Sequence, residues 1–182
     1  MNAPTPLKNK IDSIIELFSS GHISEALNTV QTLISQHPNE ALLHNISGVC
    51  SKATGQLEMA AQSFKRAVAI KSDFADAHYN LGLTLQELNQ LDDAVKCYEK
   101  ALTIKPDYAE AFNNLGVTLK DLDQLDEAVK CYEKALIIKP DYPEAYNNLG
   151  NALKNLGRVS KAAECFERML TIESGYAEGH SN

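Results

Sequence analysis

Asparagine is the residue type whose spacing in this sequence suggests a chemical role. Asn80, Asn114 and Asn148 follow one another at intervals of 34 residues, and Asn113 and Asn147 directly precede two of them. A side-chain amide carries both donor hydrogens and an acceptor oxygen, so it can pair with the N–H and the C=O of a peptide backbone. A row of such amides is suited to holding an extended chain whatever that chain's side chains are.

Residues that could support catalysis or bind a metal form no pattern of their own. Cys97, Cys131 and Cys165 also recur every 34 residues, without a CxxC spacing, and Cys50 stands alone. The sequence has no Gly-rich phosphate loop, nucleophile elbow or HExxH motif. We therefore predict a protein that is not an enzyme and that has no metal site and no cofactor, with the cysteines packed as small apolar residues.

The asparagines belong to a longer repeat. Residues 75–108 and 109–142 are identical at 25 of 34 positions. In the second copy the apolar spacing of Leu115, Leu119 and Leu122 predicts one helix, Asp123–Gln124 breaks it, and Pro140 ends a second one. The short connection makes the two helices antiparallel neighbours, and stability must come from stacking of successive pairs.

The conserved-looking positions within one copy carry a resemblance to a known family. They are Phe112, Leu115, Gly116, Leu119, Ala128, Tyr132, Ala135 and Pro140. In order and spacing these resemble the tetratricopeptide repeat, and the stretch AEAFNNLG is similar to repeats of O-linked N-acetylglucosamine transferases. The resemblance implies an all-α, right-handed α-solenoid of antiparallel helix pairs whose first helices line a concave, peptide-binding groove.

Extending the period in both directions predicts the organisation of the whole chain. Residues 1–6 form a disordered lead, 7–40 a degenerate capping repeat, and 41–74, 75–108, 109–142 and 143–176 four further repeats of one solenoid domain. The final stretch 177–182, AEGHSN, aligns with AEAFNN and predicts the start of a truncated sixth repeat. We therefore expect the chain to be the N-terminal part of a longer polypeptide.

Composition limits the partners. The 182 residues carry a formal net charge of −7 with no basic stripe, which argues against binding nucleic acid. There is no apolar run of about 18 residues that could span a membrane and no signal-peptide core. These features predict a cytoplasmic protein whose partner is another protein or a peptide.

The predicted binding face lies on the first helices. Five of the nine differences between the two near-identical repeats fall on one helical face, at Glu110, Asn113, Val117, Lys120 and Asp121. Together with the amides and lysines at matching positions, the candidate concave-face residues are Asn45, Lys52, Asn80, Asn113, Asn114, Lys120, Asn147, Asn148, Asn151 and Lys154. The alternative is that the asparagine recurring in each repeat forms hydrogen bonds within or between repeats.

The N-terminal end of this face is apolar instead of amide-rich, at Ile11, Ile15, Phe18, Ile46 and Val49. One interpretation is a docking site for a partner or for a second copy of the chain. The other is that the first helix is rotated so that these side chains are buried at the end of the stack.

These observations predict a protein-interaction module that binds an extended peptide or a partner surface in its concave groove. Two alternatives remain open at this point. One is the substrate-recruiting N-terminal arm of a larger enzyme of the glycosyltransferase, sulfotransferase or oxygenase type, which the resemblance suggests. The other is a scaffold that forms homo-oligomers through its repeat ends.

Overall fold

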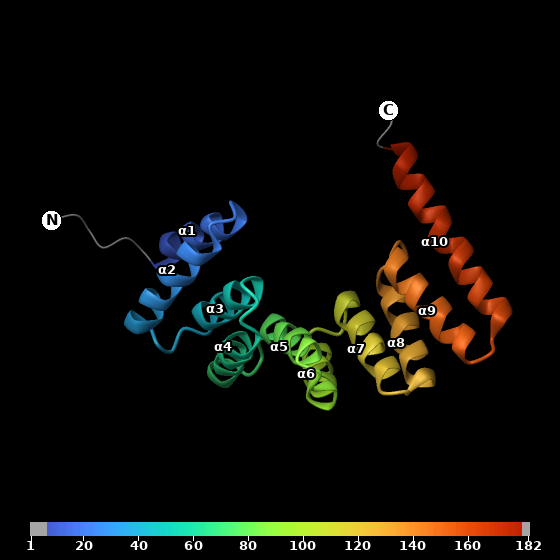
Figure 1. Cartoon of the computed structure of the whole chain (residues 1–182), viewed down its shortest axis with the longest axis horizontal. Coiled ribbons are helices and arrows are strands. Elements are labelled where there is room, and N and C mark those ends of the chain that lie inside the picture. The colour runs from blue at the N-terminus through green and yellow to red at the C-terminus, as the bar shows by residue number, and fades with distance from the viewer. Residues whose placement is uncertain (1–6, 180–182) are drawn as a thin grey trace. The chain divides into compact units, whose positions relative to one another are not determined.

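The computed structural model describes the main chain of residues 7–179, with the side chains of residues 7–174, and the regular secondary structure in this part of the chain is all α-helix. Figure 1 shows the helices in chain order. The ten described helices are α1 (Leu7–Ser19), α2 (Ile23–Gln36), α3 (Ala41–Ala53), α4 (Leu57–Ile70), α5 (Ala75–Glu87), α6 (Leu91–Ile104), α7 (Ala109–Asp121), α8 (Leu125–Ile138), α9 (Pro143–Asn155) and α10 (Val159–Gly179). None of the described helices is long and apolar enough to cross a membrane.

The described part of the chain forms two compact units, which divide between residues 89 and 90. In the first unit α1 packs on α2, α2 on α3, α3 on α4 and α4 on α5. In the second unit α6 packs on α7, α7 on α8, α8 on α9 and α9 on α10. Within each unit, therefore, every helix is packed against the next one along the chain, as stacked helix pairs require.

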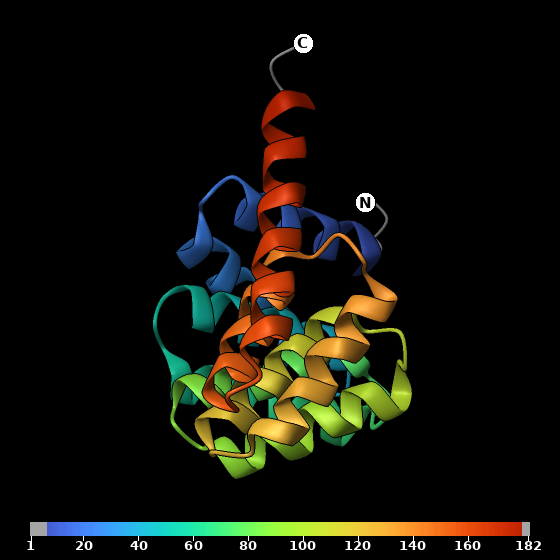
Figure 2. The same ribbon diagram turned by 90° about the vertical axis from the view of Figure 1, so that its right-hand side faces the viewer.

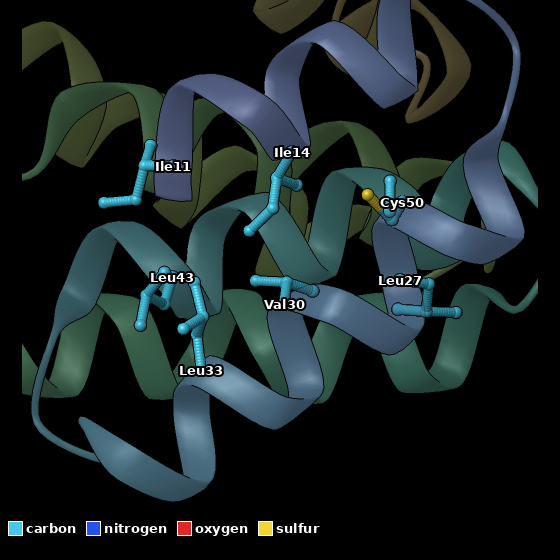
Figure 3. Close-up of a cluster of buried hydrophobic side chains, with 8 residues drawn as sticks. Ile11, Ile14, Leu27, Val30, Leu33, Leu43 and Cys50 are labelled. Atoms are coloured by element: carbon cyan, nitrogen blue, oxygen red, sulfur yellow. The ribbon is translucent and has the colours of Figure 1, made fainter. Parts of the chain in front are cut away.

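The core of the first unit begins in the degenerate first repeat. Ile11 and Ile14 of α1 meet Val30 and Leu33 of α2 and Leu43 of α3 in one buried cluster (Figure 3). Ile14 and Val30 stand where the inner repeats have glycine and an aromatic ring, and both are fully buried. Aliphatic side chains thus replace the glycine–ring contact at this end of the chain.

In three later helix pairs, α3 with α4, α7 with α8 and α9 with α10, a glycine lies against an aromatic ring. A Cβ atom placed on Gly116 of α7 would lie 2.6 Å from Cε1 of Tyr132 on α8. The same relation joins Gly48 to Phe64, at 2.5 Å. Because real Cβ atoms are not found this close to another carbon and the rings are fully buried, only glycine allows the two backbones to approach.

The break predicted at Asp123–Gln124 is present and has a left-handed residue at its centre. Asp123 has φ of +62° after the end of α7. The backbone N–H groups of Asp123 and Gln124 donate to the carbonyl oxygens of Lys120 and Leu119, at 3.0 and 2.8 Å. These bonds satisfy carbonyls that the end of the helix would leave unpaired, and aspartate tolerates the left-handed region better than most residues.

α10 differs from the other second helices. It runs without interruption through 21 residues to Gly179, whereas α8 has 14 (Figures 1 and 2). The predicted boundary between the repeat 143–176 and the sixth repeat 177–182 therefore falls inside this continuous helix, while residues 180–182 lie outside the described residues. The replacement of proline by Ser174 does not by itself explain why α10 continues. Ser72 replaces the same proline after α4, and α4 still ends at Ile70. α4 is followed by α5, which packs against it, and α10 is the last helix of the described residues.

Gly116→Ala tests the glycine–ring contact. The new methyl group would press on the buried Tyr132 ring, so we expect the free energy of unfolding to fall by about 1–3 kcal/mol despite the better helix propensity of alanine. Urea denaturation followed by circular dichroism measures the change. In a Tyr132→Leu background the same substitution should cost less, and an equal cost in both backgrounds would contradict the contact.

Tyr132→Phe tests a polar group that the fold leaves unpaired. The Tyr132 hydroxyl is buried and has no hydrogen-bond partner among the described residues, and burial raises its pKa so that it stays neutral. Removing it should raise the free energy of unfolding by about 1 kcal/mol, since an unsatisfied buried hydroxyl is costly. Phe64 and Phe166 already occupy the equivalent position in other repeats. A lower stability in thermal or urea unfolding would show that the hydroxyl has a partner.

Candidate functional site

The asparagines of the second unit form a hydrogen-bonded chain between successive first helices. Nδ2 of Asn148 on α9 donates to Oδ1 of Asn113 on α7 at 3.0 Å. Nδ2 of Asn113 in turn donates to Oε1 of Glu144, also at 3.0 Å. Asn113 is fully buried, so both ends of its amide are used inside the protein.

The first unit repeats this geometry. Nδ2 of Asn80 on α5 donates to Oδ1 of Asn45 on α3 at 3.2 Å, and Asn45 is 9% exposed. In both units the donor comes 35 residues after the acceptor. The sequence left open that the asparagine recurring in each repeat forms hydrogen bonds between repeats. Asn80 and Asn148 form such bonds.

The side-chain amides of Asn80 and Asn148 also have a donor and an acceptor that these bonds do not use. Asn80 and Asn148 are half-buried, and each uses one amide hydrogen, which leaves the second hydrogen and Oδ1 without a partner among the described residues. Asn147 and Asn151 of α9 are exposed. Asn114 is half-buried and is itself engaged in a further interaction. Each unit has an amide face of its own, which comprises Asn45 and Asn80 in the first unit and Asn113, Asn114, Asn147, Asn148 and Asn151 in the second.

The three lysines predicted beside these amides differ in their surroundings. Nζ of Lys52 lies 2.6 Å from Oε1 of Glu87 on α5. Nζ of Lys120 lies 3.5 Å from the carboxylate of its neighbour Asp121, and Lys154 is exposed. Solvent-exposed ion pairs of this kind contribute little to stability, so these side chains can exchange partners at small cost.

The predicted apolar end divides into a buried and an exposed part. Ile11 is 9% exposed and belongs to the core of the first unit, so it is not available for docking. Phe18 and Ile46 pack partly against that core, and Val49 is half-buried. Ile15 is 51% exposed because one helical step rotates it away from the face that Ile11 and Ile14 bury.

The second unit also contains a groove that the sequence did not predict. A cavity of about 710 Å³ lies between α6, α7 and α8, with Val95, Phe112 and Cys131 among its lining. Nζ of Lys134 at its rim is 5.4 Å from the centroid of the Phe112 ring. Burial raises the pKa of the Cys131 thiol to about 11, so this cysteine is a poor nucleophile at neutral pH.

The equivalent seam between α8 and α10 is tighter. Val129 and Cys165 are 5% and 9% exposed there, whereas Val95 and Cys131 are half-buried. Two ion pairs reach α10 and the turn before it, Arg158 to Asp126 at 2.7 Å and Arg168 to Asp141 at 3.8 Å. At the open seam Gln124 and Lys134 stand in place of these two arginines.

The described residues contain no disulfide and no cluster of side chains that could bind a metal ion. All four cysteines are free thiols. No group of three or more histidine, cysteine or acidic side chains in residues 7–174 is placed to hold a metal ion.

Family models match the chain over most of its repeats. One described as TPR repeat matches residues 52–88 and 118–157. Two described as tetratricopeptide repeat match residues 75–108 and 143–176 and residues 97–130. A comparison with curated proteins gives no significant match.

Several solved structures share the fold at low sequence identity. The crystal structure of MamA is 24% identical, covers 90% of this chain and 95% of its own, and has a TM-score of 0.85. Pseudomonas aeruginosa pilF is 19% identical over 90% of this chain and 75% of its own, with a TM-score of 0.83. YrrB is 21% identical over 91% of this chain and 85% of its own, with a TM-score of 0.77. These similarities confirm the predicted fold class, an α-solenoid of helix pairs.

Asn113→Ala tests the buried amide of the chain. The substitution leaves the Asn148 amide and the Glu144 carboxylate without their shared partner, so we expect the free energy of unfolding to fall by about 1–3 kcal/mol. The adjacent Asn147→Ala removes an exposed amide and serves as the control, with an effect within about 0.5 kcal/mol. Equal losses in urea denaturation would contradict the assignment.

Proposed function

This chain belongs to the tetratricopeptide repeat family, and on that premise we propose that it is a non-enzymatic protein-interaction module. The amide face of each unit holds an extended segment of a partner protein. The observation that carries the proposal is that the two asparagines of each hydrogen-bonded pair have different surroundings. The buried members, Asn45 and Asn113, fix the partly exposed members, Asn80 and Asn148, in place.

Fixing an amide before it meets a ligand favours binding. A free asparagine on a helix surface loses rotamer freedom when a partner orders it, and this loss opposes association. One hydrogen bond to the preceding repeat already orients Asn80 and Asn148, while Oδ1 and one N–H stay available. Those two groups match the donor and acceptor of a peptide backbone.

The spacing within a unit also suits an extended peptide. Stacked helices are separated by roughly 8–10 Å, which corresponds to about three residues of extended chain at roughly 3.3 Å per residue. In the second unit Asn147, Asn151 and Lys154 are exposed along α9 beside Asn148. The amides would hold the backbone there, and Lys154 would favour an acidic side chain.

A structural relative gives this proposal modest support. YrrB, which shares the fold, is described as a TPR protein with an unusual peptide-binding site. At 21% identity the likeness itself reaches only to the fold, so the binding residues proposed for this chain rest on its own hydrogen bonds. No observation in the described residues favours the enzyme-arm or scaffold alternatives over peptide binding.

The double substitution Asn80→Ala with Asn148→Ala tests the proposal. Peptides are first selected against the whole chain from a random displayed library and measured by fluorescence anisotropy. We expect the double variant to bind them at least tenfold more weakly with helicity preserved, because it removes one orienting amide from each unit. The control is Asn9→Ala with Asn28→Ala, two exposed amides on α1 and α2 outside the amide face. Unchanged affinity in the double variant would reject the amide face as the binding surface.

A further inference from the structure

The groove between α6 and α8 leaves an apolar floor uncovered between inner repeats of the second unit. We call it the α6–α8 groove, and its apolar lining consists of Val95, Leu102, Phe112, Leu115, Leu119 and Cys131. Valine and cysteine hold the same repeat positions at the seam between α8 and α10, and there both are buried. The distance between the helices, and not the residue type, therefore leaves Val95 and Cys131 half-buried.

The two walls of the α6–α8 groove carry opposite charges. Glu99 on α6 and Lys134 on α8 both line the groove, both are exposed, and neither forms an ion pair among the described residues. Lys130 and Glu127, also on α8, lie 3.9 Å apart and neutralise each other. Because Glu99 and Lys134 occupy adjacent repeat positions on equivalent helices, the two uncompensated charges face the groove at about the same level.

The α6–α8 groove offers a peptide backbone no hydrogen-bonding partner at its floor. The main-chain N–H and C=O groups of α6 and α8 are used within those helices. Of the uncharged polar residues in the lining, Thr103 and Gln124 are exposed, and the Thr103 hydroxyl already donates to the Glu99 carbonyl oxygen at 2.8 Å. An extended segment would lose water from its own N–H and C=O groups here without compensation. A helix satisfies those groups internally, so a helix is the form of backbone that suits this groove.

We propose that the α6–α8 groove is a second interaction surface, separate from the amide face, and that it binds an amphipathic helix of a partner protein. The apolar stripe of that helix, at spacings of three and four residues, packs on Val95, Phe112 and Cys131. Lysine or arginine along one flank of the stripe faces Glu99, and glutamate or aspartate along the other flank faces Lys134. These charges also fix the direction of the helix, because reversing it would exchange the flanks and bring like charges together.

A second copy of this chain is a poorer occupant of the groove than a partner protein. The large apolar side chains that residues 7–174 expose are Ile15, Leu42, Met59, Ile137, Val159 and Leu170. Only α10 carries two of them, and these are separated by three turns of the helix. None of the described helices therefore presents the continuous apolar stripe that the floor of the groove requires.

A designed helix tests the proposal on the whole chain. The probe is a fluorescein-labelled peptide of 14 residues, the length of α8, with leucine and alanine on its inward face, lysine on one flank and glutamate on the other. A hydrocarbon staple on the opposite face holds it helical. Fluorescence anisotropy should show saturable binding, at least tenfold weaker for Glu99→Lys. Glu133→Lys makes the same change at the exposed counterpart of Glu99, outside the groove, and should alter the affinity less than twofold.

Exchanging the charges of the two walls gives a sharper result. Lys134→Glu alone should also weaken binding at least tenfold, because the glutamate flank then meets a carboxylate. In the double variant Glu99→Lys with Lys134→Glu, the probe can lie in the opposite direction with both flanks matched. We expect this variant to bind within about threefold of the unmodified chain, since a second substitution restores a charge match but does not repair a damaged groove.

Three results would overturn the proposal. The first is no binding of the probe to the unmodified chain, and the second is an equal loss of affinity in Glu99→Lys and Glu133→Lys, or a double variant that binds no better than the single ones. The third is a dimer in analytical ultracentrifugation that Glu99→Lys dissociates, with no probe binding, because a second copy would then occupy the groove. Peptides selected for the amide face should bind Glu99→Lys normally, so failure here is distinguishable from failure of the proposed function.

Discussion

The close approach of paired helices is the constraint on which the rest of this molecule depends. Gly48, Gly116 and Gly150 each allow an aromatic ring of the partner helix to lie against the backbone, with virtual Cβ distances of 2.5 to 2.7 Å. No larger residue fits without moving a ring that has little space to move. This contact fixes the distance between the two helices of a pair, and thereby the position at which the next pair can stack.

Stacking then determines what the asparagines do. Two consecutive asparagines in a helix point in directions about 100° apart, so one is turned into the stack and the other toward its edge. Asn113 takes the first role, with full burial and two hydrogen bonds, and Asn148 of the next repeat takes the second. The same residue type therefore contributes to the stability of the stack and to the surface proposed for recognition.

The first and the last described helices, α1 and α10, expose different kinds of side chain. Asn9 and Glu16 place polar groups on the outer side of α1, and aliphatic packing of Ile14 with Val30 replaces the glycine–ring contact there. At the other end Met169, Leu170 and Glu173 remain on a surface whose counterpart in the preceding repeat is covered by a helix.

The amino-acid sequence by itself determined the fold class, the positions of the helices in the inner repeats and the break at Asp123, because period, glycine, proline and apolar spacing are local signals that stacking reinforces. It also indicated that the first helices carry the amides. Tertiary structure alone decided which asparagine of each hydrogen-bonded pair is buried, and that Ile11 joins the core while Ile15 does not. It also decided that the seam beside Cys131 is open and that α10 continues past Ser174. These outcomes depend on which neighbouring helix reaches a given side chain, and identical residue types at identical repeat positions cannot express that difference.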